Sequence, residues 1–234
     1  MDKKRIATWI GSIIGSLCII FVLLISAVEI GAYGSNGFYE KEYAKYDVLK
    51  DVKMKMPDVM YVTKEMMAFL KGKRETLIVH TVVDGQKREF FNKREIAHME
   101  DVQHLFVKGM ELRMKALIMI LALLMVARLG KTPWKQVLPK AFQYTVIGFG
   151  AISAILTAVI ATDFTKYFTK FHEIFFSNDL WLLDPSTDLL INLLPEGFFV
   201  DIAMRIGLIF GGLLIGSFLI ATLIRNAYKK VKIY

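Results

Sequence analysis

Four histidines are the side chains in this sequence best suited to proton transfer near neutral pH. His98 lies in the run Glu95-Ile-Ala-His98-Met-Glu-Asp101. On a helix both Glu95 and Asp101 fall within about 60° of His98, and such an acid can orient an imidazole and stabilise its cation. His98 is therefore a candidate general base, although a partly solvated histidine on a capped surface helix would give the same pattern.

His172 lies within a stripe of aromatic residues that recur at helical spacing. The stripe consists of Phe164, Tyr167, Phe168, Phe171, Phe175 and Phe176. A dry aromatic surround favours the neutral imidazole, which is the form that a general base needs. An aromatic belt at a membrane surface, with the histidine at headgroup level, is the alternative interpretation.

The other two histidines are weaker candidates. His80 falls inside an expected strand, where a structural role is favoured, and His104 lies about 120° around the helix from His98. The sequence contains no H-E-x-x-H zinc motif and no G-x-S-x-G nucleophile elbow. Zinc shared by His98 and His172 with carboxylates stays a weaker alternative. We expect no metal and no cofactor.

The elements that must position these residues belong to a membrane protein. The 234 residues are 55% hydrophobic, with a mean hydropathy of +0.44 and one cysteine, Cys18, which excludes a disordered chain and a disulfide-stabilised scaffold. A helix needs about 20 apolar residues to cross the bilayer. The sequence predicts four such transmembrane helices, at residues 6–30, 109–128, 141–162 and 202–225.

The charges beside these segments predict one orientation. The N-terminus, the connection after the second segment and the C-terminus together carry eleven basic residues and one acid, Asp2. The basic residues are Lys3, Lys4, Arg5, Arg128, Lys131, Lys135, Lys140, Arg225, Lys229, Lys230 and Lys232. By the positive-inside rule both termini are cytoplasmic. The net charge of +8 is therefore a topology signal, and we expect no nucleic-acid partner.

Residues 31–108 and 163–201 would then form a small α+β cap on the outer face. Pro57 is typical of a first helical turn and Gly72 of a helix end, with Val59, Val62, Met66, Phe69 and Leu70 on the apolar side. Two β-rich runs flank Asp84-Gly85 and predict a hairpin. Asn92 and Glu95 have the spacing of a capping box that would start the helix carrying His98.

Arg205 lies near the outer end of the fourth apolar segment. Charges at that depth usually have a partner, so we expect Arg205 to pair with Glu196 or Asp201, or to bind a lipid phosphate or carbonyl.

The two histidine motifs together resemble one membrane family. Glu95-Ile-x-His98-Met-x-Asp101-Val102 is followed by Phe171-His172-x-Ile-Phe-Phe176, Asn178, Trp181 and Pro195-Glu-x-Phe-Phe199. This pattern, with four spans and an outer cap, is similar to that of the bacterial lipoprotein intramolecular transacylases. The resemblance covers essentially the whole chain.

The resemblance implies an acyltransferase of the bacterial cell membrane. Its substrates are lipoproteins whose N-terminal cysteine carries a thioether-linked diacylglyceryl group. The sn-2 acyl chain moves to the cysteine α-amino group and leaves a lyso-form lipoprotein. Two histidines at the boundary between cap and membrane carry the reaction, and by motif these are His98 and His172. Membrane lipids are further partners, and we expect a monomer.

The residues suit this chemistry, because an α-amine with a pKa near 8 must lose a proton and a glyceryl oxygen must gain one. We hypothesise that His98 is the base, oriented by Glu95 or Asp101, and that His172 protonates the leaving oxygen; the reverse is also open. Asn178, Tyr167 and Arg205 are candidates to stabilise the oxyanion. The candidate substrate-binding wall is Phe168, Phe171, Phe175, Phe176 and Trp181.

Two other functions remain as alternatives. One is a non-enzymatic membrane receptor or scaffold with an extracellular cap, in which the two histidines would have no reason to approach each other. The other is a lipid-ester hydrolase, which would use the same pocket with water as the acceptor and release a free fatty acid.

Overall fold

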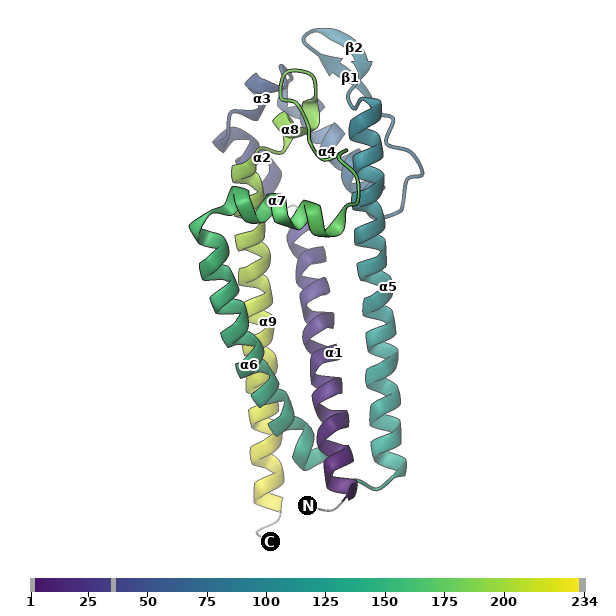
Figure 1. Cartoon of the computed structure of the whole chain (residues 1–234), viewed down its shortest axis with the longest axis vertical. Coiled ribbons are helices and arrows are strands. Elements are labelled where there is room, and N and C mark those ends of the chain that lie inside the picture. The colour runs from purple at the N-terminus through teal and green to yellow at the C-terminus, as the bar shows by residue number, and fades with distance from the viewer. Residues whose placement is uncertain (1–2, 35–36, 232–234) are drawn as a thin grey trace. The chain divides into compact units, whose positions relative to one another are not determined.

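The computed structural model describes the backbone of residues 3–34 and 37–231, with side chains as far as Tyr228. Within these residues the chain is mainly helical (Figure 1). The elements are α1 (Lys3–Tyr33), α2 (Phe38–Lys45), α3 (Val48–Asp51), α4 (Met56–Leu70), β1 (His80–Val83), β2 (Gln86–Glu89), α5 (Lys93–Leu129), α6 (Trp134–Thr162), α7 (Phe164–Phe175), α8 (Leu189–Leu193) and α9 (Glu196–Val231). Asp2, Lys232 and the side chains of Lys229 and Lys230, which contribute to the predicted charge bias, lie outside the described residues.

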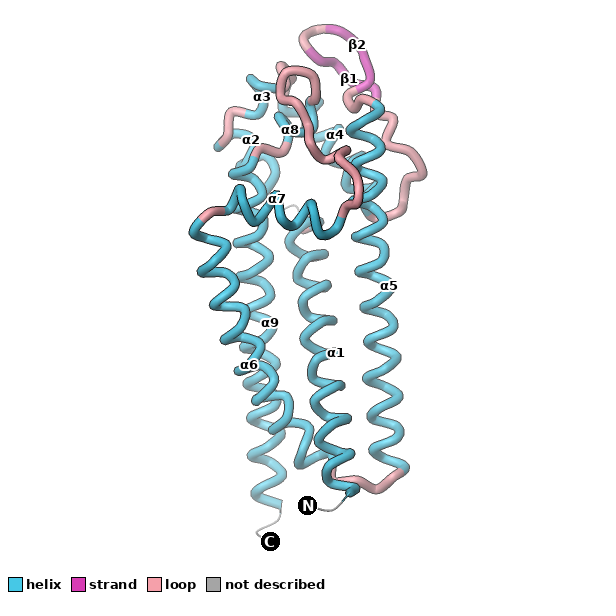
Figure 2. The backbone as a smooth tube through the Cα atoms, in the orientation of Figure 1, coloured by secondary structure: helices cyan, strands magenta, loops and turns pink. Residues whose placement is uncertain are grey.

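The chain divides into two compact units. The long-helix unit contains residues 1–31, 110–162 and 205–234, and the mixed unit contains residues 32–109 and 163–204. In the part of the chain that the structure describes, the strands are confined to the β1–β2 hairpin of the mixed unit, shown in magenta in Figure 2. The assignment of segments to membrane and outer cap stays a prediction.

Among the residues that the structure describes, three helices are long and apolar enough to cross a membrane: α1, α6 and residues 196–228 of α9. They contain the predicted spans 6–30, 141–162 and 202–225. Much of their apolar surface is exposed, with Leu208 74% and Ile155 65% accessible, which suits contact with lipid rather than water. A small cluster of Ile20, Phe142, Leu214 and Ala221 joins the three helices.

The predicted span 109–128 is not among these three helices. It forms the second half of α5, where every stretch of 18 residues within 109–129 includes Arg113, Lys115 and at least one further charged residue. The Arg113 guanidinium donates to Glu29 of α1 at 2.5 Å, so part of this charge is neutralised within the long-helix unit. The helical membrane fold is thus supported by three helices, and the fourth span stays a prediction.

The core of the mixed unit is built on α4. Its buried face carries the residues that the sequence pattern predicted, namely Val59, Val62, Met66, Phe69 and Leu70. Gly72 ends the helix with a φ of +68°, donating to the Phe69 carbonyl at 2.8 Å, while the Lys73 N–H donates to the Ala68 carbonyl at 3.0 Å. These two bonds form a Schellman motif and confirm the predicted helix end.

The predicted hairpin is confirmed. Its paired strands, His80–Val83 and Gln86–Glu89, are shorter than the β-rich runs on either side of Asp84-Gly85. β1 pairs with β2 antiparallel, with His80 opposite Glu89 and Val83 opposite Gln86. Asp84 and Gly85 have φ angles of +52° and +76°, as a type I′ turn requires.

The first turn of α9 packs against α2 in the same core. The ring of Phe198 lies 5.7 Å from that of Tyr39 and 6.4 Å from that of Tyr43. A side chain at Gly197 would collide with the ring of Tyr46, so glycine permits this close approach. The neighbouring Phe199 is thereby held next to α7, where its ring lies 4.7 Å from Phe168.

Candidate active site

The N-terminal cap of α5 fixes where His98 lies. Asn92 Oδ1 accepts hydrogen bonds from the N–H groups of Arg94 at 2.9 Å and Glu95 at 3.0 Å, and Glu95 Oε2 accepts from Asn92 N–H at 2.6 Å. This is the predicted capping box. Glu95 Oε1 accepts from the Leu190 N–H of α8 at 2.6 Å. Because both oxygens of the buried Glu95 carboxylate bond to backbone amides, this side chain anchors the helix rather than orienting the ring of His98.

α7 carries the predicted aromatic stripe except for Phe176, which follows its last residue with an extended backbone. Asp163 caps its N-terminus and accepts from Lys166 N–H at 3.1 Å. The apolar face carries Phe164, Tyr167, Phe168, Phe171, Ile174 and Phe175. At 100° per residue, His172 falls at the edge of this face, one turn after Phe168. The imidazole therefore lies between aromatic and polar surroundings.

The structure brings His98 and His172 together within the mixed unit. Their ring centroids are 5.9 Å apart and their planes are inclined by 36°. Phe176 lies 5.4 Å from His98 and 5.6 Å from His172, Phe168 meets His172 edge-on at 4.5 Å, and the indole of Trp181 stacks on His172 at 5.0 Å. His98 is buried and His172 is half-buried, so the site is a pair of imidazoles in an aromatic surround.

The tautomer of His172 follows from one hydrogen bond. Its Nδ1 lies 2.7 Å from the carbonyl oxygen of Phe168. A carbonyl oxygen only accepts, so Nδ1 carries the hydrogen and Nε2 of the neutral ring holds the lone pair. Burial lowers the pKa of His172 below its ordinary 6.5, and the bond to Phe168 partly offsets this effect. His172 is therefore a neutral proton acceptor at pH 7.

His98 has a different electrostatic environment. Burial first, and the neighbouring His172 second, lower the pKa of His98 to about 4, although the Asp101 carboxylate opposes this shift. Its Nδ1 is buried without a hydrogen-bond partner among the described residues. A ring with so low a pKa is a poor base at pH 7, but it still has one N–H to donate.

Asp101 acts on the loop that follows α7. Its Oδ2 accepts from Asn178 Nδ2 at 2.8 Å, and Asn178 Oδ1 accepts from Leu180 N–H at 3.1 Å. The Trp181 indole N–H donates to the Asn178 carbonyl at 2.9 Å. The Asn178 amide is thus bonded both to α5 and within its own loop, and these bonds hold the indole that stacks on His172.

Arg94, which no sequence pattern marked as a site residue, makes a second contact with the same loop. The Arg94 guanidinium donates to the carbonyl oxygen of Asp179 and lies 3.6 Å from its carboxylate. Arg94 and Asp101 are seven residues apart on α5 and so share one face, on which His98 lies between them. The spacing indicates that Arg94 lies on the same helix face as His98, but no sequence pattern indicates Asp179 as its partner.

Other predicted residues lie at the margin of the site or outside it. Phe171 meets His172 edge-on at 5.6 Å, whereas Phe175 packs on Phe171 and is 53% exposed. Arg205 belongs to the long-helix unit. Of its two predicted partners, Glu196 accepts from Thr165, and Asp201 accepts from Lys45 and Tyr46. The pairing of Arg205 itself stays a prediction. His80 and His104 are exposed.

Within residues 3–34 and 37–231, no cluster of three or more His, Cys, Asp or Glu side chains is arranged to hold a metal ion.

The fold and the site define a helical membrane protein with a histidine pair in an aromatic surround, and comparison with known proteins identifies its family. The family model for lipoprotein intramolecular transacylase Lit matches residues 13–199, so the chain belongs to the lipoprotein intramolecular transacylase family. The predicted family and the predicted acyltransferase activity are thereby confirmed. The membership also speaks against the receptor or scaffold alternative.

Solved structures share the fold. The membrane-integral lipoprotein intramolecular transacylase Lit from Bacillus cereus, solved in meso, is similar with a TM-score of 0.75 at 22% identity, over 97% of this chain and 99% of that one. Variants of that protein with one histidine replaced by alanine or by arginine give TM-scores of 0.73 and 0.72, also at 22% identity; each match covers 97% of this chain, and 96% and 94% of theirs. No curated protein sequence matches the chain.

Proposed function

We propose that His98 and His172 together catalyse transfer of the sn-2 acyl chain of a diacylglyceryl-cysteine lipoprotein to the cysteine α-amino group. The neutral amine attacks the ester carbonyl, the new N–C bond forms, and the bond from the acyl carbon to the glyceryl oxygen breaks. One proton must leave the nitrogen and one must reach the oxygen. An ester becomes an amide and the total mass of the lipoprotein does not change.

His172 is the proton carrier in this proposal. Its Nδ1–H is held by the Phe168 carbonyl, which leaves Nε2 free to take the amine proton during attack. The resulting imidazolium then gives that proton to the departing glyceryl oxygen. One imidazole used twice satisfies both steps, and such general acid–base catalysis contributes about 10²–10⁴-fold.

His98 is a neutral hydrogen-bond donor to the developing oxyanion. A pKa of about 4 keeps its ring uncharged at pH 7 and makes it a weak base. A neutral imidazole N–H in a dry site can still stabilise negative charge on the ester oxygen. With 5.9 Å between the two ring centroids, one ester group is within reach of both rings. This reverses the role that the sequence analysis favoured for His98.

The aromatic surround would hold the reacting ends together. The amine and the ester are joined through sulfur and glyceryl carbons, so the transfer passes through a medium-sized ring with an unfavourable closure entropy. Phe168, Phe176 and Trp181 present flat apolar surfaces around the imidazoles. Confinement against such walls raises the effective concentration of the amine and excludes water that would hydrolyse the ester.

We further propose that four helices span the membrane, with both termini cytoplasmic and the histidine site at the outer face. Three helices have the length and composition of spans. The second half of α5 is the fourth, because its Arg113 is paired with Glu29 and its other charges lie towards the ends of the segment. Basic side chains at span ends can extend to the interface.

The observation that carries the proposed function is the close pair of imidazoles with one Nε2 free to accept a proton. The test is mass spectrometry of a diacylglyceryl lipopeptide incubated with the purified protein in detergent. Unchanged mass with one acyl chain on the amine supports the proposal. Loss of one acyl chain as free fatty acid would identify a hydrolase instead.

A further inference from the structure

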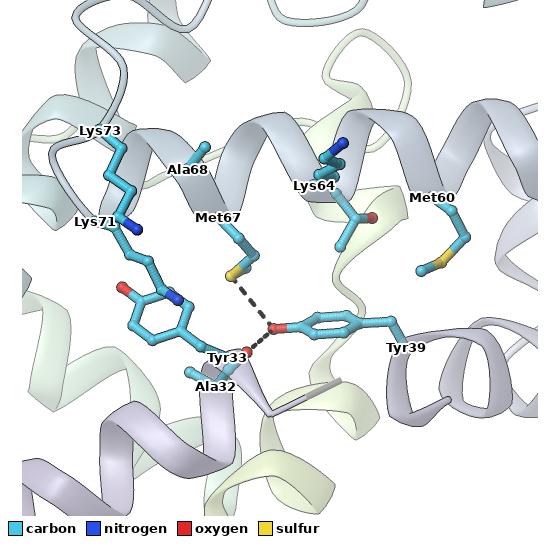
Figure 3. Close-up of a pocket in the computed structure, with 10 residues that line it drawn as sticks. Ala32, Tyr33, Tyr39, Met60, Lys64, Met67, Ala68, Lys71 and Lys73 are labelled. Atoms are coloured by element: carbon cyan, nitrogen blue, oxygen red, sulfur yellow. Dashed lines mark hydrogen bonds between the residues drawn. The ribbon is translucent and has the colours of Figure 1, made fainter. Parts of the chain in front are cut away.

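A separate cavity of about 310 Å³ lies in the mixed unit, between the end of α1, the start of α2 and one face of α4 (Figure 3). None of its lining residues belongs to the histidine site. Its lining is mainly apolar and includes Tyr39, Met60 and Met67. The Tyr39 hydroxyl donates to the Ala32 carbonyl at 2.7 Å and contacts Met67 Sδ at 3.4 Å, so its polar atom is engaged inside the cavity wall.

Three lysines surround this cavity: Lys64, Lys71 and Lys73. Lys64 and Lys71 are seven residues apart and therefore lie on the same side of the α4 helix, and Lys73 follows the left-handed turn at Gly72. Within the described residues none of the three forms an ion pair. The neighbouring acid, Glu65, is paired with Arg74. Three positive charges are thus gathered without an acid to neutralise them.

The position of the cavity along the chain indicates its surroundings. Ala32 and Tyr33, which line it, are the last residues of α1, a candidate membrane span. The end of a span lies at the level of the lipid headgroups, where tyrosine is enriched. The Lys71 ammonium lies 3.9 Å from the centre of the Tyr33 ring, so a cation is held at that level.

We propose that this cavity binds an anionic phospholipid, with its phosphate among the three lysines and the start of its acyl chains over Met60 and Met67. Lysine ammonium groups match a phosphate, and the thioether side chains match hydrocarbon. The diacylglyceryl group of the lipoprotein substrate contains no phosphate, so the bound lipid is distinct from that substrate. The inference therefore goes beyond the proposed function and does not depend on it.

An acidic polypeptide segment is the competing occupant. The apolar lining favours the lipid, because a peptide carboxylate would bring polar backbone groups against the two methionines without hydrogen-bond partners. The test therefore includes both kinds of ligand.

The experiment measures lipid binding to the full-length chain, stripped of lipid in a neutral detergent, by titration with dioleoyl phosphatidylglycerol and native mass spectrometry. The dioleoyl phosphatidylcholine titration serves as the zwitterionic reference. A lysine near an anionic lipid contributes roughly fivefold in affinity. We expect the Lys64→Gln/Lys71→Gln/Lys73→Gln variant to lose at least tenfold in phosphatidylglycerol affinity and to bind phosphatidylcholine as the wild type does.

A matched control removes the same charge elsewhere in the mixed unit. Lys41, Lys50 and Lys87 are exposed, and none of them forms an ion pair in the described part of the chain. Their triple Gln variant should keep its phosphatidylglycerol affinity within about twofold. Equal losses in the two triple variants would overturn the site in favour of general electrostatic attraction.

Filling the cavity tests its shape without changing charge. Ala68 lines the cavity, so Ala68→Phe should reduce phosphatidylglycerol affinity at least tenfold while all three lysines remain. Thermal unfolding verifies that each variant is folded; if the triple variant is not, the single Lys64→Gln variant should still lose roughly fivefold.

A competition experiment distinguishes a phospholipid from a free phosphate compound and from an acidic peptide as the ligand of this cavity. Glycerol phosphate, which has no acyl chain, should compete at least a hundredfold more weakly than the lipid. Equal competition would show a simple phosphate site, and stronger competition by an acidic peptide would show a protein partner; either result overturns the lipid proposal.

Discussion

The indole of Trp181 stacks on the imidazole of His172, with ring centroids 5.0 Å apart and planes inclined by 29°. The two residues come from different segments, α7 and the loop after it, and the loop is held by the bond from Asn178 to Asp101. The stacked indole covers one face of the proposed proton carrier. It therefore restricts the plane of the ring, while the hydrogen bond from Nδ1 to the Phe168 carbonyl fixes the orientation of the ring within that plane.

Replacing Trp181 should reduce turnover by loosening His172. An aromatic pair contributes about 0.5–1.5 kcal/mol, so Trp181→Leu should lower kcat up to about tenfold. Trp181→Phe keeps a ring against His172 and should lose less. Initial rates of acyl transfer measure both. A change in KM with kcat unaltered would assign Trp181 to substrate binding instead of positioning.

The two histidines should respond differently to glutamine. A glutamine side chain can donate a hydrogen bond but cannot carry a proton. His98→Gln should therefore retain more activity than His98→Ala, for which we expect a loss of about 10²–10³-fold. His172→Gln should be as inactive as His172→Ala, with losses of about 10²–10⁴-fold. Single-turnover transfer to the amine provides the measurement, and equal residual activity in both glutamine variants would contradict the assigned roles.

Stability should fall with acid because of His98. Its pKa is about 4 in the folded protein and 6.5 in the unfolded chain, so the unfolded chain binds more protons between these values. The stabilisation is complete above pH 6.5 and is lost as the pH falls towards 4. On the order of 2 kcal/mol should disappear between pH 7 and pH 5.

Thermal unfolding of the wild type and His98→Gln at the two pH values isolates this effect. Burial raises the pKa of Glu95 and gives a slope of the opposite sign, but that slope is common to both proteins and cancels in the difference. Parallel pH dependence in the two proteins would show that His98 is not responsible.

Glu95 should matter for stability more than for chemistry. Its carboxylate accepts from two backbone amides, Asn92 N–H and Leu190 N–H. Glu95→Ala leaves both buried donors unpaired, at about 1–3 kcal/mol each. Glu95→Gln keeps one acceptor oxygen and should lose roughly half as much. Chemical denaturation measures the cost. If Glu95→Ala is stable but inactive, the role of Glu95 is to orient His98 and not to stabilise the fold.

The two ties from α5 to the loop should act together. Asp101→Ala removes the acceptor for Asn178, and Arg94→Met removes the contacts to Asp179. Each substitution should lower kcat a few-fold by freeing Trp181. The double variant should lose about as much kcat as Trp181→Leu, so the losses of the two single variants should not be additive. Glu100→Ala, at an exposed neighbouring position, is the control. Strictly additive losses in the double variant would show that the two contacts do not act through Trp181.

The sequence by itself determined the features that depend on neighbours along the chain. The buried face of α4, the Gly72 helix end, the Asp84-Gly85 turn and the Asn92–Glu95 cap depend on helical or strand periodicity and on local hydrogen bonds, so a short window contains the whole cause. The same holds for the three long apolar helices. The motif around each histidine could also be recognised from the sequence, and the two motifs together indicated the family.

Only the tertiary structure decided what depends on contacts between distant segments. No pattern along the chain indicates that Glu95 bonds to Leu190, that Arg94 meets Asp179, or that Arg113 pairs with Glu29. It also could not assign the proton on His172, because that assignment rests on a carbonyl at 2.7 Å, nor the low pKa of His98, because that rests on burial and on a second imidazole 74 residues away in the chain. Charge and hydrogen bonding act through space, and the fold alone sets those distances.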